Sequence, residues 1–185
     1  MLKYRDLFHG IYFVPETAFA GTRDNQKEKK LNEIYREYCA TVKREAPEKM
    51  ILMSPATIYC PDKMNEMVDS WLAILDNVPL DIMAPQDSIG TCENELIYQS
   101  KTYKAWSKVC HKCGIAFWSN IEIFERKDSI VGVSHSIPAS PERVSAQINH
   151  ATPYVEKLIC WEAPYYLYSG VEGQKLKEFL TKISN

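Results

Sequence analysis

The sequence is poor in glycine, and none of its predicted strands is followed by a glycine-rich loop. Seven of the 185 residues are glycine. A nucleotide-binding loop needs closely spaced glycines after a strand, because its backbone N–H groups must approach the phosphates. An open, flavodoxin-like sheet that binds a nucleotide is therefore the least favoured function, and no cofactor is expected. A Gly/Ser-rich linker is also missing, so we expect a single domain over residues 1–185.

The chain also lacks a strong net charge and long hydrophobic runs. Its formal net charge is −2 and its isoelectric point is about 6.1. These values give no electrostatic reason to expect a nucleic acid or an anionic membrane as a partner. Charged and apolar residues are interleaved from Met1 to Asp6, so neither a signal peptide nor a transmembrane segment is visible. As it stands, the chain is expected in the cytoplasm.

Six cysteines are present, mostly inside predicted helices and strands, so free thiols are favoured over a disulfide framework. Cys110 and Cys113 have the spacing of half a zinc site. However, no second Cys/His pair follows at zinc spacing, and Gly114 ends the predicted helix just after Cys113. We therefore prefer a helix end that buries Cys110 over a structural zinc site, and expect no metal.

The main positive signal is a set of five short apolar runs that each end in polar residues. Continuous apolar runs are typical of parallel strands that helices cover on one side. The carboxyl ends of such strands carry the active site in (β/α) barrels. The runs with their polar ends cover residues 10–16, 50–55, 80–90, 115–122 and 158–164.

Between the runs, apolar residues recur at spacings of three and four, which predicts helices. Ser140 and Pro141 are typical of an N-cap and a first turn, and Asp62 is a second candidate N-cap. Gly114 is expected to form a left-handed C-terminal cap. The predicted helical stretches are residues 31–42, 64–75, 96–110, 144–155 and 176–183.

This alternation predicts an α/β fold of the (β/α) TIM-barrel type. A closed barrel needs eight units and about 250 residues, whereas this chain has five units. Two alternatives follow: an open doubly wound sheet, or a partial barrel that lacks about three N-terminal units. A partial barrel would expose its edge strands and inner face, which predicts self-association. Residues 125–139 form the longest irregular stretch and are expected to lie over the rim.

The strand-end phrases at residues 10–16, 81–90 and 117–125 resemble an uncharacterised TIM-barrel family. This family is a domain of unknown function, related in architecture to glycoside hydrolases and found mainly in gut bacteria. The resemblance covers nearly the whole chain and implies the C-terminal part of the barrel, from strand four to strand eight. It further implies carbohydrate as substrate or ligand, and export of the full-length relatives.

Under this resemblance, Glu16 ends strand four and Glu122 ends strand seven, where retaining (β/α) glycosidases hold their acid/base and nucleophile. Hydrolysis of a glycoside requires two such carboxyls, one protonated to assist the leaving oxygen and the other ionised. Glu125 is an alternative nucleophile. We prefer Glu122, because Trp118, Asn120 and Glu122 share one face of a strand. The competing interpretation is that both carboxylates cap helices or pair with basic residues.

The resemblance also implies a sugar-binding surface, with Trp161 as an aromatic floor and amide and carboxyl groups that bind sugar hydroxyls. For Asp87 the alternative role is the N-cap of the next helix, and for the tryptophans it is packing in the barrel core. The alternative function is a non-catalytic barrel fragment that binds glycan or serves as a scaffold. The expected substrate-binding residues are Gln86, Asp87, Trp118, Asn120, Trp161 and Glu162.

Overall fold

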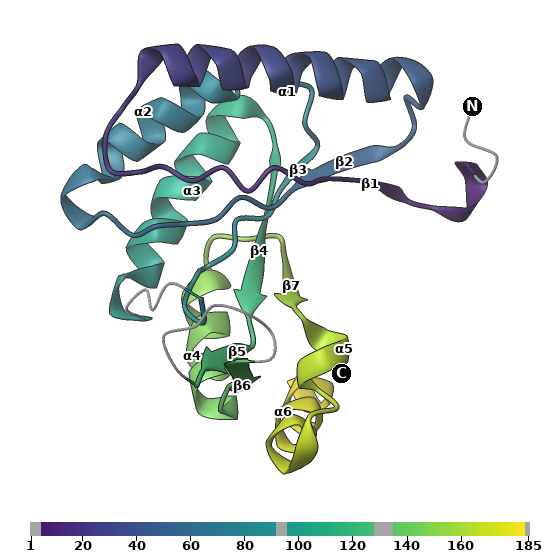
Figure 1. Cartoon of the computed structure of the whole chain (residues 1–185), viewed down its shortest axis with the longest axis vertical. Helices are drawn as coiled ribbons and strands as arrows, with labels where there is room; N and C mark the ends of the chain where they lie inside the picture. The colour runs from purple at the N-terminus through teal and green to yellow at the C-terminus, as the bar shows by residue number, and fades with distance from the viewer. Residues whose placement is uncertain (1–4, 92–95, 128–134, 184–185) are drawn as a thin grey trace.

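The computed structural model describes residues 5–91, 96–127 and 135–183. In these ranges, five parallel strands form one sheet in the order β1-β2-β3-β4-β7, which confirms the five predicted strands. The sheet curls from β1 to β7 as a half-barrel (Figure 1). The strands are β1 (Gly10–Phe13), β2 (Met50–Met53), β3 (Ile82–Met83), β4 (Ala116–Glu122) and β7 (Lys157–Trp161).

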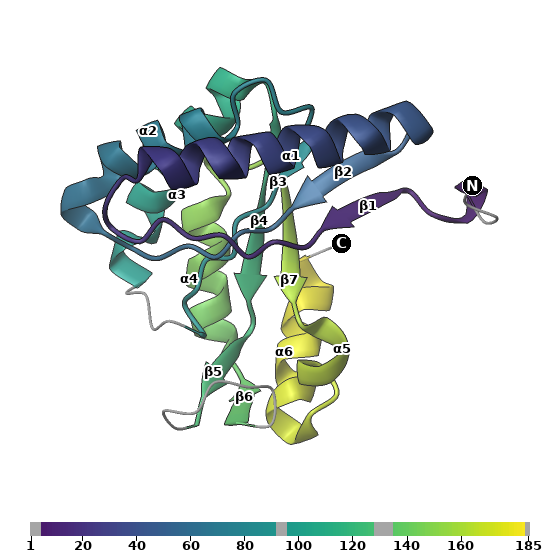
Figure 2. The same cartoon turned by 45° about the horizontal axis from the view of Figure 1, so that its top comes forward.

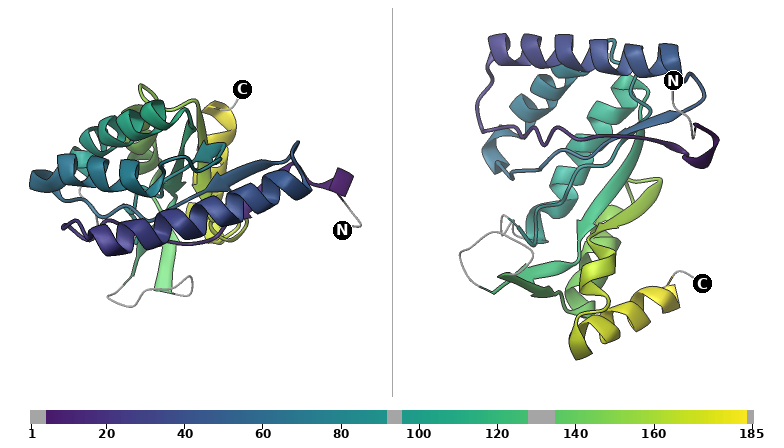
Figure 3. Two further views of the ribbon diagram at one scale, coloured as in Figure 1. Left: turned by 90° about the horizontal axis from the view of Figure 1, so that it is seen from above. Right: turned by 45° about the vertical axis from the view of Figure 1, so that its right-hand side comes forward.

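Helices follow the strands in the chain and cover the outer side of the curl, as Figures 2 and 3 show. Short 3-10 helices lie at Arg5–Leu7, Pro61–Lys63 and Leu96–Tyr98. The α-helices are α1 (Asn25–Glu45), α2 (Met64–Ile74), α3 (Gln99–Cys113), α4 (Pro141–Ala151), α5 (Ala163–Tyr166) and α6 (Gly170–Ile183).

The ends of these helices agree with local sequence signals at two of the three predicted sites. The Ser140 side chain accepts a hydrogen bond from the Arg143 N–H and caps α4. Gly114 ends α3 with φ 67° and ψ 31°, the left-handed conformation that glycine adopts without steric cost. The Asp62 prediction was wrong: Asp62 lies inside a 3-10 helix, and the N-cap of α2 is Lys63, which makes no side-chain capping bond.

Two clusters of buried side chains hold the helices on the sheet. In the larger one, Trp71 of α2 and Trp106 of α3 pack with ring centroids 4.9 Å apart, together with residues of α1 and β1 to β4. The smaller cluster joins Ile121 of β4 to α4, α5 and α6. Leu158 of β7 packs against both clusters. A fully buried isoleucine, leucine, methionine or phenylalanine side chain contributes about 1.5–3 kcal/mol to stability.

The stretch from 125 to 139 differs from the predicted irregular loop. Its two ends form an antiparallel pair between β5 (Phe124–Arg126) and β6 (Ser136–Pro138). Residues 128–134 lie outside the described part of the chain. The pair is a separate two-stranded sheet that follows directly on β4, beyond the carboxyl end of the five-stranded sheet.

Among the described residues, no helix is both long enough and apolar enough to span a membrane.

Candidate functional site

The carboxyl ends of four neighbouring strands bring together a polar group that we call the rim cluster: Glu16, Ser54, Gln86 and Asn120. The Gln86 amide donates to the Glu16 carboxylate at 3.1 Å and to the Ser54 carbonyl at 3.2 Å. The Asn120 amide donates to the Ser54 hydroxyl at 3.0 Å. Because all five strands are parallel, their ends meet at the same edge of the sheet, and these side chains become neighbours.

One acceptor of the rim cluster is buried and has no hydrogen-bond partner among the described residues. Asn120 is 6% exposed, and its side-chain oxygen has no hydrogen-bond partner among the residues that the structure describes. A buried polar atom without a partner costs about 1–3 kcal/mol. A ligand hydroxyl that donates to this oxygen would remove that cost.

The side chains of β4 alternate between the two sides of the sheet. Phe117 and Ile121 pack into the two hydrophobic clusters on the helix side. Trp118, Asn120 and Glu122 therefore face the concave side. This arrangement agrees with the predicted shared face and places Glu122 at the same edge of the sheet as Glu16.

Glu122 is almost completely buried, and its carboxylate accepts hydrogen bonds from Thr91 in the loop that follows β3. Thr91 donates its backbone N–H to one carboxylate oxygen at 2.6 Å and its hydroxyl to the other at 2.9 Å. Burial raises the pKa of Glu122, while the two bonds from Thr91 act in the opposite direction. Nothing in the sequence points to Thr91, because a threonine in a loop carries no signal of a long-range contact.

Asp87 lies on the opposite side of the sheet from Gln86, its neighbour in the sequence. Its carboxylate accepts from the amides of Gln99 in α3 and Gln147 in α4, at 3.0 and 2.6 Å. The structure therefore directs this side chain toward the helices. Burial raises the pKa of Asp87 to about 7, and the nearby Glu122 charge adds to the effect.

Glu125, the alternative nucleophile, lies in β5 and is part of a different contact. Its carboxylate forms an ion pair with the Arg143 guanidinium at 3.3 Å. Arg143 also donates to the backbone carbonyls of Glu122 and Phe124. Burial lowers the pKa of Arg143, whereas Glu125 raises it. Glu125 therefore pairs with a basic residue. This is the role that the alternative to catalysis predicts for carboxylates at this edge of the sheet.

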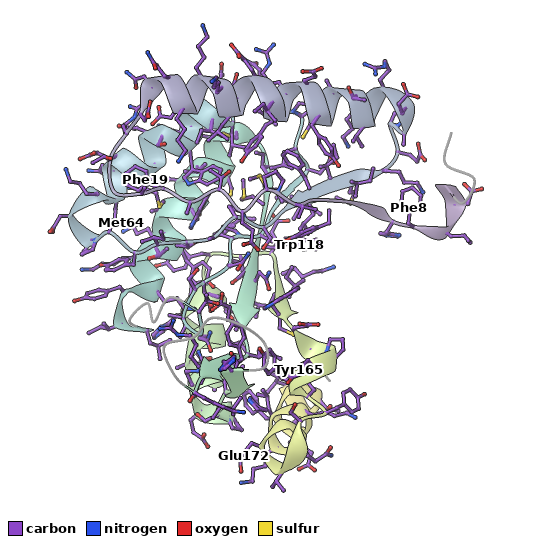
Figure 4. All side chains as sticks on the ribbon, in the orientation of Figure 1. Phe8, Phe19, Met64, Trp118, Tyr165 and Glu172 are labelled. Carbon is purple, nitrogen blue, oxygen red and sulfur yellow. The ribbon has the colours of Figure 1, made fainter. Side chains whose placement is uncertain are left out.

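The two predicted tryptophans lie on adjacent strands. Trp118 is half-buried near the middle of the curled sheet (Figure 4). The Lys157 ammonium lies 4.5 Å from its ring centroid. Trp161 ends β7 and is 49% exposed, so it is available for contact with a ligand. Glu162 follows it through a cis peptide bond and is half-buried.

Two residues that the sequence analysis did not select could have been found. Ser54 directly follows the apolar run of β2, in the same place as the selected residues of the other strands. Gln147 lies one turn from Val144 and Ala151 on the buried stripe of α4, where a polar residue predicts a buried partner.

Comparison with known proteins identifies the family of the chain. Residues 3–171 match the family described as a domain of unknown function, DUF4434. The chain belongs to this family. The DUF4434 match confirms the predicted domain of unknown function. No curated protein matches the chain.

The fold of this DUF4434 domain is similar to that of a solved structure from Bacteroides thetaiotaomicron, described as "a putative alpha-L-fucosidase". The TM-score is 0.66 at 17% sequence identity, and the match covers 82% of this chain. It covers 49% of the Bacteroides chain, so this domain spans about half the length of that protein. At this identity the likeness shows that the two chains share a fold.

Proposed function

We propose that this protein acts on carbohydrate as part of a glycoside-hydrolase-like barrel, with Glu16 as acid/base and Glu122 as nucleophile. The observation that carries the proposal is the rim cluster, in which hydrogen bonds join the ends of β1, β2, β3 and β4 on the concave side. The fold likeness to the Bacteroides protein supports the same class of reaction.

The environments of the two carboxyls suit two different roles. Glu16 is exposed and receives one bond from the neutral Gln86 amide, so it can exchange a proton with a leaving oxygen. Glu122 receives two bonds from Thr91, which favour its ionised form and oppose burial, the larger effect, which raises its pKa. In a retaining reaction, Glu122 attacks the anomeric carbon while Glu16 protonates the departing oxygen. Water then releases the sugar, with Glu16 acting as base.

The remaining polar and aromatic groups suit the binding of a sugar. Gln86 and Asn120 offer amide groups to sugar hydroxyls, and Asn120 has an unused buried acceptor. Trp118 and Trp161 offer aromatic rings on the same concave side, and such rings pack well against the apolar face of a sugar. We expect Glu162, next to Trp161, to contribute from the edge of this surface.

One observation favours a second candidate, glycan binding without hydrolysis. Glu122 is 1% exposed, and Thr91 covers both of its carboxylate oxygens. A nucleophile must reach the anomeric carbon, whereas a binding domain needs only the exposed Glu16 and Trp161 side chains and the half-buried Gln86 side chain.

Turnover of a panel of aryl glycosides, combined with binding of oligosaccharides by calorimetry, separates the two candidates. Glu122→Gln preserves size and hydrogen bonding, so it should abolish nearly all turnover and leave binding within about threefold. Glu125→Gln is the matched control and should retain turnover. Loss of turnover in Glu125→Gln alone would assign the nucleophile to Glu125. Binding without turnover by the unmodified chain would establish glycan binding without hydrolysis.

A further inference from the structure

We propose that Asp87 is a positioning residue that fixes Glu122 and its hydrogen-bond donor Thr91 in one arrangement. The proposal rests on the proposed function, because Glu122 is the proposed nucleophile. In this role Asp87 acts from the helix side of the sheet, whereas the sequence predicts that it contacts the substrate.

The first oxygen of the Asp87 carboxylate joins the end of β4 to the loop that follows β3. It accepts the Glu122 backbone N–H at 3.2 Å and the Ile89 backbone N–H at 3.3 Å. Thr91 lies two residues beyond Ile89 and holds the Glu122 carboxylate on the concave side. One buried carboxylate oxygen of Asp87 therefore fixes the position of the Glu122 backbone and of the loop that carries Thr91.

The second carboxylate oxygen fixes Asp87 to two helices. It accepts from Gln99 at the start of α3 and from Gln147 in α4, both of which are buried. Gln147 also donates to the Glu122 carbonyl at 3.2 Å. Asp87 thus connects α3, α4, β4 and the loop, and its position does not depend on a flexible exposed side chain.

The loop itself has little freedom to adopt another path. Ser88 has φ 54°, and its buried hydroxyl accepts the Thr57 backbone N–H at 3.2 Å. A Cβ atom at Gly90 would lie 2.5 Å from the Phe124 carbonyl oxygen, so the loop packs directly on the backbone of β5. Asp87 supplies the hydrogen bonds between this packed loop and the residue whose carboxylate it holds.

The conservative and the disruptive variants of Asp87 should behave differently. In Asp87→Asn, the remaining oxygen can still accept from Ile89 and Glu122. The new amide can donate to Gln99 and Gln147 if they rotate, because both have a side-chain oxygen without a hydrogen-bond partner among the described residues. Asp87→Ala loses these bonds to Ile89, Glu122, Gln99 and Gln147 and should release Thr91.

The test measures hydrogen exchange of the Thr91 amide by NMR, which needs no substrate and so stands apart from the proposed function. Asp87→Ala should exchange this amide about tenfold faster, and Asp87→Asn should stay within about threefold of the unmodified chain. Asp81→Asn is the matched control. It loses a carboxylate that accepts the Ile51 N–H at 2.7 Å at the opposite end of the sheet, and it should leave Thr91 unchanged.

Unchanged exchange of Thr91 in Asp87→Ala would overturn the proposal, as would equal acceleration at every amide of β3 and β4. If Asp87→Ala does not fold, Asp87→Ser takes its place, with the same criteria. Failure of both to fold while Asp87→Asn folds would also overturn it, because Asp87 would then support the whole fold. On any glycoside that is turned over, Asp87→Ala should lower kcat at least tenfold and change KM less than threefold.

Discussion

Gln86 pairs with Asn120 in a parallel bridge beyond the last residue of β3. The bridge continues the alternation of the sheet past the end of the regular strand, so both amides face the concave side. The next residue, Asp87, then faces the helices, where Gln99 and Gln147 bind it. Beyond the bridge, the Gln86 and Asn120 amides therefore lie on the concave side, and the Asp87 carboxylate lies on the helix side.

Gln86→Ala should weaken binding of any glycan ligand about tenfold, because it removes the amide that joins Glu16 to Ser54. Calorimetric titration measures the change. Gln174→Ala is the control, since Gln174 is exposed on α6 and contacts Glu178 of the same helix. Equal affinity of the two variants would remove the rim cluster from the proposed binding site.

The stability of the chain should fall as the pH rises from 5 to 8. Asp87 has a pKa of about 7 in the folded protein, whereas an unfolded aspartate has a pKa of about 3.9. The folded state therefore holds a proton that the unfolded state releases, and this stabilisation is lost as the pH passes 7. Urea denaturation at several pH values tests this. The slope should flatten in Asp87→Asn and persist in Asp81→Asn; an equal slope in all three would contradict the assigned pKa.

Gly114→Ala should destabilise the protein by about 1 kcal/mol. No atom lies within 4 Å of the Cβ position, so the cost comes from the left-handed backbone at φ 67° and not from a clash. Chemical denaturation measures the change. Ala105→Gly, in the interior of the same helix, should cost a similar amount for the opposite reason. A neutral Gly114→Ala would mean that the cap adopts another conformation.

The chain alone should self-associate. β1 and β7 are the edges of the sheet, and Tyr12 and Trp161 on these strands are 48% and 49% exposed. Light scattering should detect species larger than a monomer. Tyr12→Lys on the β1 edge should reduce them, whereas Tyr168→Lys, outside the sheet, should not. A stable monomer of the unmodified chain would show that the open edges are tolerated.

The sequence predicts the strands well because each is a short apolar run bounded by proline, glycine or charged residues. It does not predict β5 and β6, because neither Phe124–Arg126 nor Ser136–Pro138 forms an apolar run. The candidate site is harder to predict from the sequence, because hydrogen bonds such as that from Thr91 to Glu122 join residues far apart in the chain. Strand alternation alone could have indicated that Gln86 and Asp87 face opposite sides.

The close approach of Gly90 to the Phe124 carbonyl limits how the site can be changed. Any side chain at position 90 must push the backbone of β5 away, and Phe124 is joined to Glu122 through the single residue Ile123. Variants designed to change the proposed sugar binding should therefore leave position 90 untouched and vary exposed side chains, such as Trp161. Because the loop at Gly90 packs on the backbone of β5, a shift of the loop must displace β5, and a shift of β5 must displace the loop.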